Sequence, residues 1–338
     1  MNVFFDADQQ LHHPQNYFSR GKMRTPEEVP MRSDAILQAV KSLGWAVEKP
    51  VDQGWGPIEA VHDHAYLAFL RDAHSEWMAT GQDWGNEVMS NVYRRSEGEP
   101  LGILAKAAHF LADGSCPIGP DTARSAYAAA QSAVAAADAV AAGAPVAFAL
   151  ARPPGHHARA DAAGGFCYLN NAAIAAQRLR KTYQRVVVLD IDMHHGQGIQ
   201  EIFYHRDDIY YISIHGDPLN FYPVVSGHAS EIGEGVGTGF NLNIPLPHGS
   251  DAATFFRALD QALVAANKFA PQAMVLAMGF DTYREDPQSK MTIDTPDFAT
   301  IAQRLAHCGW PTAIVFEGGY HAATLQHNAQ TFLQHWQR

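Results

Sequence analysis

The chain has 338 residues, of which 47% are hydrophobic and only 17% are charged. These proportions exclude a disordered tail or a small disulfide-stabilised module, and they leave room for one large α/β domain or two smaller ones. The 24 basic and 35 acidic residues give a formal net charge of -11, which argues against nucleic acids and anionic membranes as partners and is compatible with a cationic ligand.

Two irregular segments, residues 5–30 and 80–121, are rich in glycine, proline and aspartate. We interpret them as long loops, and the second as a loop insertion. Long loops within a compact domain often carry function. Both segments are therefore candidates for the walls of a pocket.

Helices and strands are predicted to alternate along the remaining chain. The alanine-rich residues 125–143 end at a glycine and predict a helix, and residues 170–181 predict another that begins at an asparagine cap and ends in basic residues. Near-continuous apolar runs are typical of strands buried on both faces. Such runs cover residues 144–150, 185–190, 209–214, 273–279 and 312–319.

Helices between buried strands imply a parallel sheet. We therefore expect the α/β class, with an open, mostly parallel sheet flanked by helices on both faces. No repeat or change in composition indicates a second domain. We predict a single domain over residues 1–338 with long active-site loops and the insertion at about residues 80–121.

Cysteine usage and the start of the chain predict a cellular location. Cys116, Cys167 and Cys308 are scattered and include no CxxC pair, so neither disulfides nor a cysteine zinc site is indicated. The N-terminus lacks a basic start followed by an apolar run, and no apolar stretch reaches the length of about 18 residues that a membrane span needs. We expect a cytoplasmic protein that contacts no membrane.

The strand at residues 185–190 runs into a cluster of acids and histidines. Asp190, Asp192 and His194 stand two residues apart, so their side chains project to one side of an extended chain. A lone Asp-x-Asp at a strand end is usually a surface turn or a helix cap. Here the neighbouring histidines add imidazole to the carboxylate oxygens, and both kinds of group suit a divalent metal.

Polar residues also follow three other predicted strands: Asp281, Tyr320 behind two glycines, and His156 with His157 behind two prolines. Open parallel sheets bind ligands beyond the carboxyl ends of their strands, where all four groups are expected to lie. A catalytic zinc usually has three protein ligands and one position for water, and Asp192, His194 and Asp281 supply that number. We therefore predict a metal-dependent hydrolase.

Ordered motifs along most of the chain resemble a known family. They include "LHHP", "RPPGHHA", "GGFCYLNNAAIAA", "LDIDMHHGQG", "SIHGDP", "GFDTYREDP" and "EGGYH". Together they are similar to the zinc-dependent deacetylases of the arginase/deacetylase fold, which include histone deacetylases and bacterial acetylpolyamine amidohydrolases. The segments "YFSRGKM", "EEVPMR", "ADGSCPIG" and "HGDPLNFYP" make the acetylpolyamine amidohydrolase branch the nearer match.

The resemblance implies a role for each residue that matches a motif. Asp192, His194 and Asp281 would be the ligands of one zinc ion per subunit. His157 would act as the general base and then as the acid that protonates the leaving amine, whereas His156 would be held by Asp190. Tyr320 would donate its hydroxyl to the oxyanion.

Three positions depart from related patterns. Many family members carry Asp or Asn as the partner of the second histidine, and Gln197 stands there in this chain. A neutral amide should stabilise an imidazolium less than a carboxylate does, which puts the basicity of His157 in question. The arginase side of the superfamily needs extra acids where this chain has Gly196 and Tyr283, so we do not expect ureohydrolase activity.

The resemblance also implies a potassium ion near Asp190, Asp192 and His194, to which Ser213 and Ile214 would contribute oxygen atoms. It further implies a narrow channel to the metal, with Gly165, Phe166 and Tyr222 at its wall. Without the resemblance, core packing would explain these aromatic residues equally well. An apolar tube suits a polymethylene chain.

An acetylated polyamine brings a second ammonium group, so an acidic rim should favour it over a neutral amide. The loops offer five candidate acids: Asp113, Glu97, Glu99, Asp217 and Asp286. The insertion resembles the segment that narrows the entrance and builds a homodimer in acetylpolyamine amidohydrolases. We therefore expect a homodimer that hydrolyses acetylputrescine- or acetylcadaverine-like substrates.

Two alternatives remain open at this point. One is a protein acetyl-lysine deacetylase, which rates on acetylated diamines and on acetyl-lysine peptides would distinguish. The other is a catalytically silent protein that binds acetylated amines. Tyr320 with both His156 and His157 argues against the second, because a binder needs neither a base pair nor an oxyanion donor.

Overall fold

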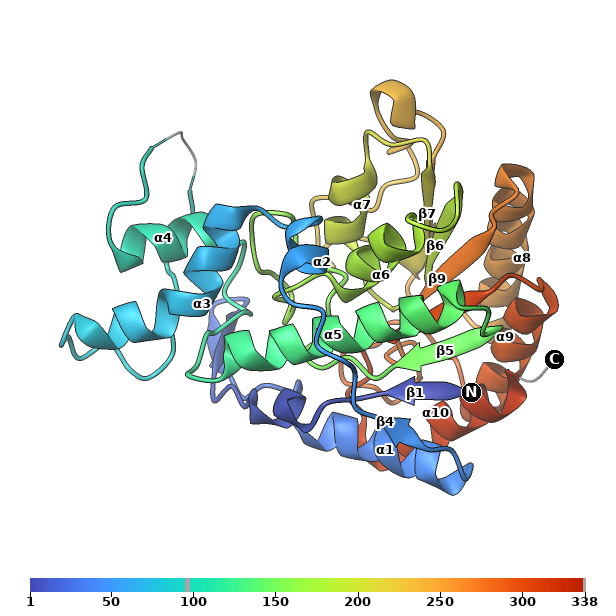
Figure 1. Ribbon diagram of the computed structural model, residues 1–338, viewed down its shortest axis with the longest axis horizontal. Helices are drawn as coiled ribbons and strands as arrows, with labels where there is room; N and C mark the ends of the chain where they lie inside the picture. Colours follow the sequence, from blue (N-terminus) through green and yellow to red (C-terminus); the bar gives the residue numbers. More distant parts are fainter. Residues whose placement is uncertain (95–97, 337–338) are drawn as a thin grey trace.

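An eight-stranded sheet forms the centre of the molecule in the computed structural model, which describes residues 1–94 and 98–336 (Figure 1). The strand order is β4-β1-β5-β10-β9-β6-β7-β8, and every neighbouring pair is parallel. The strands are β1 Asn2–Phe4, β4 Val47–Glu48, β5 Val146–Ala149, β6 Val186–Asp190, β7 Ile209–Gly216, β8 Asn241–Leu246, β9 Ala273–Met278 and β10 Thr312–Phe316.

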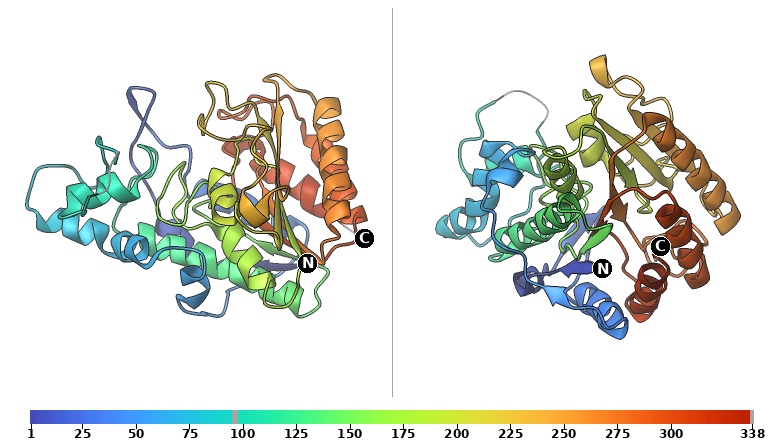
Figure 2. Two further views of the ribbon diagram at one scale, coloured as in Figure 1. Left: turned by 90° about the horizontal axis from the view of Figure 1, so that it is seen from above. Right: turned by 45° about the vertical axis from the view of Figure 1, so that its right-hand side comes forward.

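Two layers of helices cover the sheet, one on each face (Figure 2). Successive residues of a strand point to opposite faces, so Val186 and Val188 of β6 join one core cluster, and Val187 and Leu189 join the other. The first cluster includes residues of α2 Gly56–Glu59, α3 His64–Ala79, α4 Ile103–Phe110, α5 Thr122–Ala141, α6 Asn171–Leu179 and α7 Gln197–Phe203. The second includes residues of α1 Met31–Ser42, α8 Ala252–Phe269, α9 Thr295–His307 and α10 Ala322–His335.

The predicted open parallel sheet with helices on both faces is confirmed, but some elements escaped the sequence analysis. Strands β1, β4 and β8 were not predicted, because the first two are only 3 and 2 residues long and the third carries two asparagines. The segment interpreted as a loop at residues 5–30 contains the antiparallel hairpin of β2 Tyr17–Ser19 and β3 Lys22–Arg24, and two 3-10 turns lie at Ala7–Leu11 and Gly235–Gly237.

The insertion at residues 80–121 also contains regular structure, since α4 lies within it. Together with α3 it extends away from the sheet (Figures 1 and 2). None of the helices in the described part of the chain combines the length and the apolar character that crossing a bilayer requires.

Candidate active site

Four neighbouring central strands bring the predicted site residues together. Strands β5, β10, β9 and β6 lie side by side in that order, and all run in the same direction. The four segments that follow them therefore leave the sheet at one edge. They carry His156 and His157, Tyr320, Asp281, and Asp192 with His194, respectively.

Asp192, His194 and Asp281 form a buried cluster whose ligand atoms lie within 4.8 Å of one another. The Nδ1 atom of His194 is 3.0 Å from Oδ2 of Asp281 and 3.2 Å from Oδ1 of Asp192. Burial and the negative charge of Asp192 both raise the pKa of Asp281. Two carboxylates this close to an imidazole fit a divalent cation, because the cation would remove their repulsion and this donor set suits zinc.

Backbone amides fix the two carboxylates. Oδ1 of Asp192 accepts a hydrogen bond from the His194 amide, at 2.9 Å, and its Oδ2 accepts one from Gly318, at 2.8 Å. Oδ1 of Asp281 accepts one from the Met193 amide, at 2.9 Å. Gly318 has to be a glycine, because an added Cβ atom would lie 2.4 Å from Oδ2 of Asp192 and 2.5 Å from Oδ2 of Asp281.

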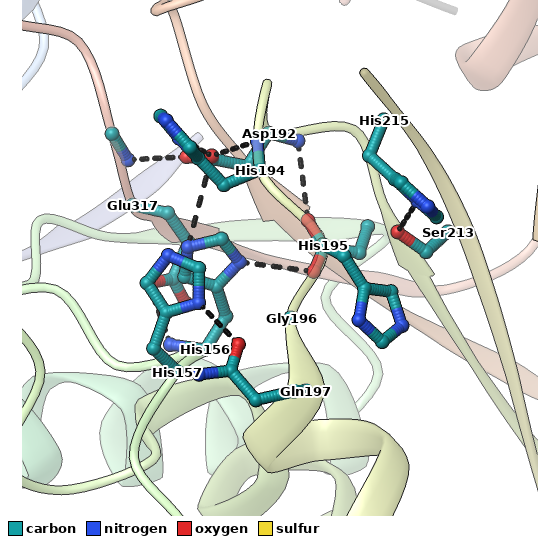
Figure 3. A network of polar contacts seen from close by, with 12 residues as sticks. His156, His157, Asp192, His194, His195, Gly196, Gln197, Ser213, His215 and Glu317 are labelled. Atoms are coloured by element: carbon teal, nitrogen blue, oxygen red, sulfur yellow. Dashed lines mark hydrogen bonds and ion pairs between the residues drawn. The ribbon is translucent and has the colours of Figure 1, made fainter. Parts of the chain in front are cut away.

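The tandem histidines lie beside this cluster, with their ring centroids 3.9 Å apart (Figure 3). Nδ1 of His156 is 3.1 Å from Oδ2 of Asp190, as the resemblance implies. Nδ1 of His157 is 2.7 Å from Oε1 of Gln197. An amide oxygen only accepts hydrogen bonds, so His157 carries its hydrogen on Nδ1 and keeps a lone pair on Nε2.

The two histidines titrate in opposite directions. Burial lowers the pKa of His156, but the charges of Asp192 and Asp190 outweigh burial and raise it to about 10. Burial, with repulsion from His156 and His194, lowers the pKa of His157 well below 6.5. A neutral His157 can accept a proton, and diverging pKa values of this kind often separate the acid from the base in a site.

A cavity of about 320 Å³ leads to the cluster, and His157, His194, Gly165, Phe166, Tyr222 and Tyr320 are among the residues that line it. Gly165 lies against His157, because a Cβ atom added there would be 2.4 Å from Cδ2 of His157. Phe166 has a left-handed backbone, with φ 68°, and makes edge-to-face contacts with Tyr17 and Tyr320. Burial raises the pKa of Tyr320 well above 10, so its hydroxyl keeps a hydrogen to donate.

Most of the acids proposed for the rim of the cavity do not lie in a suitable place. Glu97 lies outside the described residues, and Glu99 and Asp217 do not line the cavity. Asp286 is only 6% exposed, and its Oδ2 accepts hydrogen bonds from the amides of Tyr320 and His321, so the expectation that it forms part of an open rim is wrong.

Asp113 does line the cavity, but its carboxylate accepts four hydrogen bonds from the protein, from the Ser115 amide and hydroxyl, the Gly165 amide and the Tyr222 hydroxyl. Four bonds fill the lone pairs of a carboxylate. Glu27 was not predicted as a site residue, but it also lines the cavity and is half-buried. In the described residues its carboxylate accepts one side-chain hydrogen bond, from Tyr17, at 3.1 Å.

Three further buried residues that hold the site were not predicted. Nε of Arg32 donates to the carbonyl oxygen of Gly319, at 2.6 Å, and its guanidinium lies 4.5 Å from the centre of the Tyr320 ring. Glu28 binds both Arg32 and Arg152. Oε2 of Glu317 accepts hydrogen bonds from the amides of Gly155 and His156, at 2.6 and 3.0 Å. No local pattern in the sequence indicates these residues. Arg32 and Glu28 are four positions apart, but the other partners named here lie 124 to 287 positions away.

Some of the residues expected near a potassium ion lie on neighbouring strands. Asp190 in β6 is paired with Ser213 in β7, and Ile214 follows in the same strand. The Ser213 hydroxyl is 2.8 Å from Nδ1 of His215. His195, which follows a predicted ligand, points away from the tandem histidines toward Ser226 and Gln200 (Figure 3).

Comparison with known proteins gives full-length matches. A model of the histone deacetylase domain matches residues 26–336. The chain is 57% identical over 332 residues to the acetylpolyamine amidohydrolase of Burkholderia pseudomallei, covering 98% of this chain and 97% of that protein. It is 42% identical over 342 residues to acetylpolyamine amidohydrolase 1 of Pseudomonas aeruginosa, covering 99% and 98%.

Solved structures agree with these matches. The crystal structure of the acetylpolyamine aminohydrolase from Burkholderia pseudomallei superposes with a TM-score of 0.98 at 56% identity, covering 99% of this chain and 98% of that chain. The HDA15 HD domain superposes with a TM-score of 0.80 at 26% identity, covering 98% and 88%.

Proposed function

Because the chain belongs to the histone deacetylase family, whose members are zinc-dependent deacetylases, we propose that it hydrolyses acetylated polyamines to acetate and the free amine. The observation that carries the proposal is the aromatic-walled cavity, which ends at the buried cluster of Asp192, His194 and Asp281 and includes the unsaturated carboxylate of Glu27. Relatives that are 37–57% identical over nearly their full length carry the name acetylpolyamine amidohydrolase, which supports the substrate class.

The residues of the cluster suit the metal of the family. Asp192, His194 and Asp281 would hold one zinc ion per subunit, since two carboxylates and one imidazole are a donor set of the kind that binds zinc. Zinc held there supplies Lewis-acid chemistry, which polarises an amide carbonyl and makes water a better nucleophile at neutral pH.

The chain's own residues would then move the protons. Nε2 of His157 takes a proton from the attacking water and returns it to the leaving amine, because Gln197 occupies its other nitrogen. Asp190 orients His156 beside it. Tyr320 lines the cavity and would donate its hydroxyl hydrogen to the developing oxyanion, and Arg32 holds the preceding backbone in place.

The cavity also favours a slender cationic substrate. Phe166 and Tyr222 offer aromatic faces to a polymethylene chain, and Gly165 keeps the wall close to His157. We assign the distal ammonium of the substrate to Glu27, whose carboxylate has room for another donor, and propose acetylputrescine and acetylcadaverine as the substrate class.

Further parts of the proposal concern the molecule as a whole. A potassium ion would bind near Asp190, Asp192 and His194, with oxygen atoms from Ser213 and Ile214. A homodimer would form through the insertion, where Val92, Leu101 and Leu104 are exposed at 61%, 78% and 52%. A single domain over residues 1–338 and a cytoplasmic location stay predictions.

Metal analysis of the purified protein, combined with rates on acetylated diamines and on acetyl-lysine peptides, tests the function. We expect about one zinc per chain and a higher kcat/KM for the acetylated diamines. A large preference for acetyl-lysine peptides would support the alternative, a protein deacetylase. A chain that hydrolyses neither would contradict the proposal.

The role of Glu27 has its own test. Glu27→Gln keeps the size of the side chain and the partner of Tyr17, but removes the negative charge. We expect KM for acetylputrescine to rise by about tenfold, because a charge-assisted hydrogen bond is replaced by a neutral one. KM for a neutral acetylated alkylamine should stay unchanged, and an equal rise for both substrates would contradict the assignment.

A further inference from the structure

The neutral partner of the second histidine is itself the start of a longer chain of hydrogen bonds. Nε2 of Gln197 donates to the Tyr222 hydroxyl, at 3.2 Å, and that hydroxyl donates to Oδ2 of Asp113, at 2.7 Å. With the bond from Nδ1 of His157 to Oε1 of Gln197, three consecutive bonds link the imidazole to a carboxylate. Asp113 lies in the 80–121 insertion, 109 positions from Tyr222.

The carboxylate determines the direction in which every bond in this chain runs. An ionised carboxylate has no hydrogen, so the Tyr222 hydroxyl must donate to Asp113 and can only accept from Gln197. Gln197 must therefore present its NH₂ group to Tyr222 and its carbonyl oxygen to His157. His157 in turn must carry its hydrogen on Nδ1, which leaves the lone pair on Nε2.

The orientation of the Gln197 amide determines the tautomer of His157, as a reversed amide shows. Its NH₂ group would then donate to Nδ1 of His157, and the hydrogen of the neutral imidazole would move to Nε2. Such an imidazole cannot accept a proton at Nε2, so it could not act as a base toward the cavity. Asp113 opposes this reversal, because the reversal needs the Tyr222 hydrogen to point at Gln197 instead.

We propose that Asp113 is a positioning residue for the hydrolysis, which acts through Tyr222 and Gln197 to hold His157 in the tautomer that can accept a proton. This inference rests on the proposed function. The insertion then has a role in the chemistry, because its Asp113 provides a carboxylate that acts on His157 through two other side chains. Gln197, the direct partner of His157, has no charge of its own.

The surroundings of the chain support this assignment. Burial and the charge of Asp113 raise the pKa of Tyr222 well above 10, so its hydroxyl keeps the hydrogen that the chain requires. The Ser115 amide and the Gly165 amide hold the carboxylate on either side, at 2.8 and 3.1 Å. Successive bonds that point the same way also polarise and strengthen one another.

Two conservative variants interrupt the chain at different links. Tyr222→Phe removes the hydroxyl and keeps the ring. Asp113→Asn keeps the shape of the side chain but replaces one carboxylate oxygen with an NH₂ group. If the remaining oxygen still accepts from Ser115, the NH₂ group faces Tyr222. The Tyr222 hydroxyl would then accept a hydrogen bond from residue 113 and donate its own hydrogen toward Gln197. Ser115→Ala is the matched control, because it removes a donor to the same carboxylate from the side that does not face Tyr222.

The direct readout is the tautomer of His157 in the zinc-loaded protein, from the ¹⁵N chemical shifts of labelled histidine, with the His157 signals assigned by their loss in His157→Gln. We expect Nδ1 to be protonated in the wild-type chain and in Ser115→Ala. In Tyr222→Phe and Asp113→Asn we expect a substantial population with hydrogen on Nε2. Wild-type tautomers in both variants would overturn the proposal.

Kinetics on an acetylated diamine provide the second readout. We expect kcat to fall by about 10- to 100-fold in Tyr222→Phe and Asp113→Asn, within the range that a positioned acid or base contributes. The double variant should be no slower than the slower single variant, because both act on one chain of bonds. Losses that multiply would show that Asp113 acts by another route.

Control measurements separate this inference from the proposed function. Zinc content should match the wild-type chain in all three variants, and Tyr222→Phe and Asp113→Asn should unfold near the midpoint of Ser115→Ala, which also loses a hydrogen bond to this carboxylate. The tautomer measurement needs no substrate, so an error in the substrate class leaves it valid. Conversely, a wild-type chain that hydrolyses acetylated diamines supports the proposed function whichever tautomer the variants adopt.

Discussion

Tyr320 lines the cavity together with His194, whereas Asp192 and Asp281 are buried beside His194. Removing Tyr320 should therefore have a different effect from removing a residue of the buried cluster. Among the described residues, no hydrogen bond joins Tyr320 to Asp192, His194 or Asp281. Within the cluster, Nδ1 of His194 lies 3.0 Å from Oδ2 of Asp281. Loss of the phenol should therefore affect turnover, and loss of a carboxylate should affect metal binding first.

Tyr320→Phe tests the oxyanion donor. We expect turnover of an acetylated diamine to fall by about 10² to 10³, the usual effect of removing one such donor. The zinc content should not change. Turnover close to that of the wild-type chain would remove Tyr320 from the mechanism.

Asp281→Ala tests the cluster directly. The change removes one of three ligand side chains and the carboxylate that the Met193 amide orients. Zinc and activity should be lost together, measured as bound metal per chain and as hydrolysis rate. One equivalent of tightly bound zinc in this variant would refute the assignment of ligands.

Gly318→Ala tests whether the cluster depends on a close approach of the backbone. The added Cβ atom would collide with the carboxylate oxygens of Asp192 and Asp281, so we expect zinc affinity to fall by about 10- to 100-fold, as when groups that orient metal ligands are lost. Gly56→Ala is the control, because no heavy atom lies within 4 Å of a Cβ added there. Equal zinc affinity in both variants would contradict the steric argument.

At the scale of elements, Glu28 connects the segment before α1 to the loops that carry the site. It is fully buried, and it binds Arg32, which holds the Gly319 carbonyl, and Arg152, which follows β5. Burial raises the pKa of Glu28, but the two arginines outweigh burial and lower it. One carboxylate therefore compensates two buried guanidinium groups.

Glu28→Ala should destabilise the fold by about 3–5 kcal/mol, because it leaves buried positive charge without a partner. The free energy of unfolding from urea titration measures the effect. Lys49→Ala is the control, because Lys49 is largely exposed and its ion pair with Asp6 contributes at most about 1 kcal/mol. A similar small loss in both variants would show that Glu28 is not structurally important.

The elements differ in how well the sequence predicts them. The central strands β5, β6, β7, β9 and β10 were found because burial on both faces leaves a continuous apolar run. Strands at the edges lack that signal, and α4 was missed because glycine and proline dominate its surroundings. Strand order was also hidden, since only the folded sheet shows that β5, β10, β9 and β6 are neighbours.

The candidate site shows the same division. The residues of "DIDMHH" share a local spacing, so their grouping was predictable from the pattern. Asp113 was picked out only as a rim acid, because its contacts with Gly165 and Tyr222 span 52 and 109 positions. Long-range contacts of this kind leave no periodicity that a single sequence can reveal.

At the scale of the whole molecule, buried neutral histidines link stability to pH. His62 accepts a hydrogen bond at Nε2 from the Asn170 amide, at 2.9 Å, and its Nδ1 lies 3.2 Å from the Ala160 carbonyl oxygen, so both nitrogens are occupied in the neutral form. Burial lowers its pKa from 6.5 to about 4. Burial lowers the pKa of His12 to about 4 as well, despite the opposing charge of Glu28.

As the pH falls, the histidines of the unfolded chain are protonated before those of the folded chain. Their contribution to the free energy of unfolding is therefore fully present above pH 6.5 and is lost between pH 6.5 and 4. Below pH 4 no further loss is expected. For His62 alone the loss should be about 3 kcal/mol. Urea titrations at pH 7.5 and pH 5 measure part of this loss, about 2 kcal/mol, and His62→Gln should weaken the dependence because glutamine does not titrate. An unchanged dependence in that variant would contradict the assignment, and effects of metal release cancel in the comparison.

Main-chain amides hold both oxygens of Asp192 and Oδ1 of Asp281 in place. Because the polypeptide backbone orients these carboxylates, their positions should not depend on which divalent ion they bind. Cobalt or ferrous iron could then be exchanged into the same scaffold as spectroscopic reporters, and any difference in rate would reflect the electronic character of the ion.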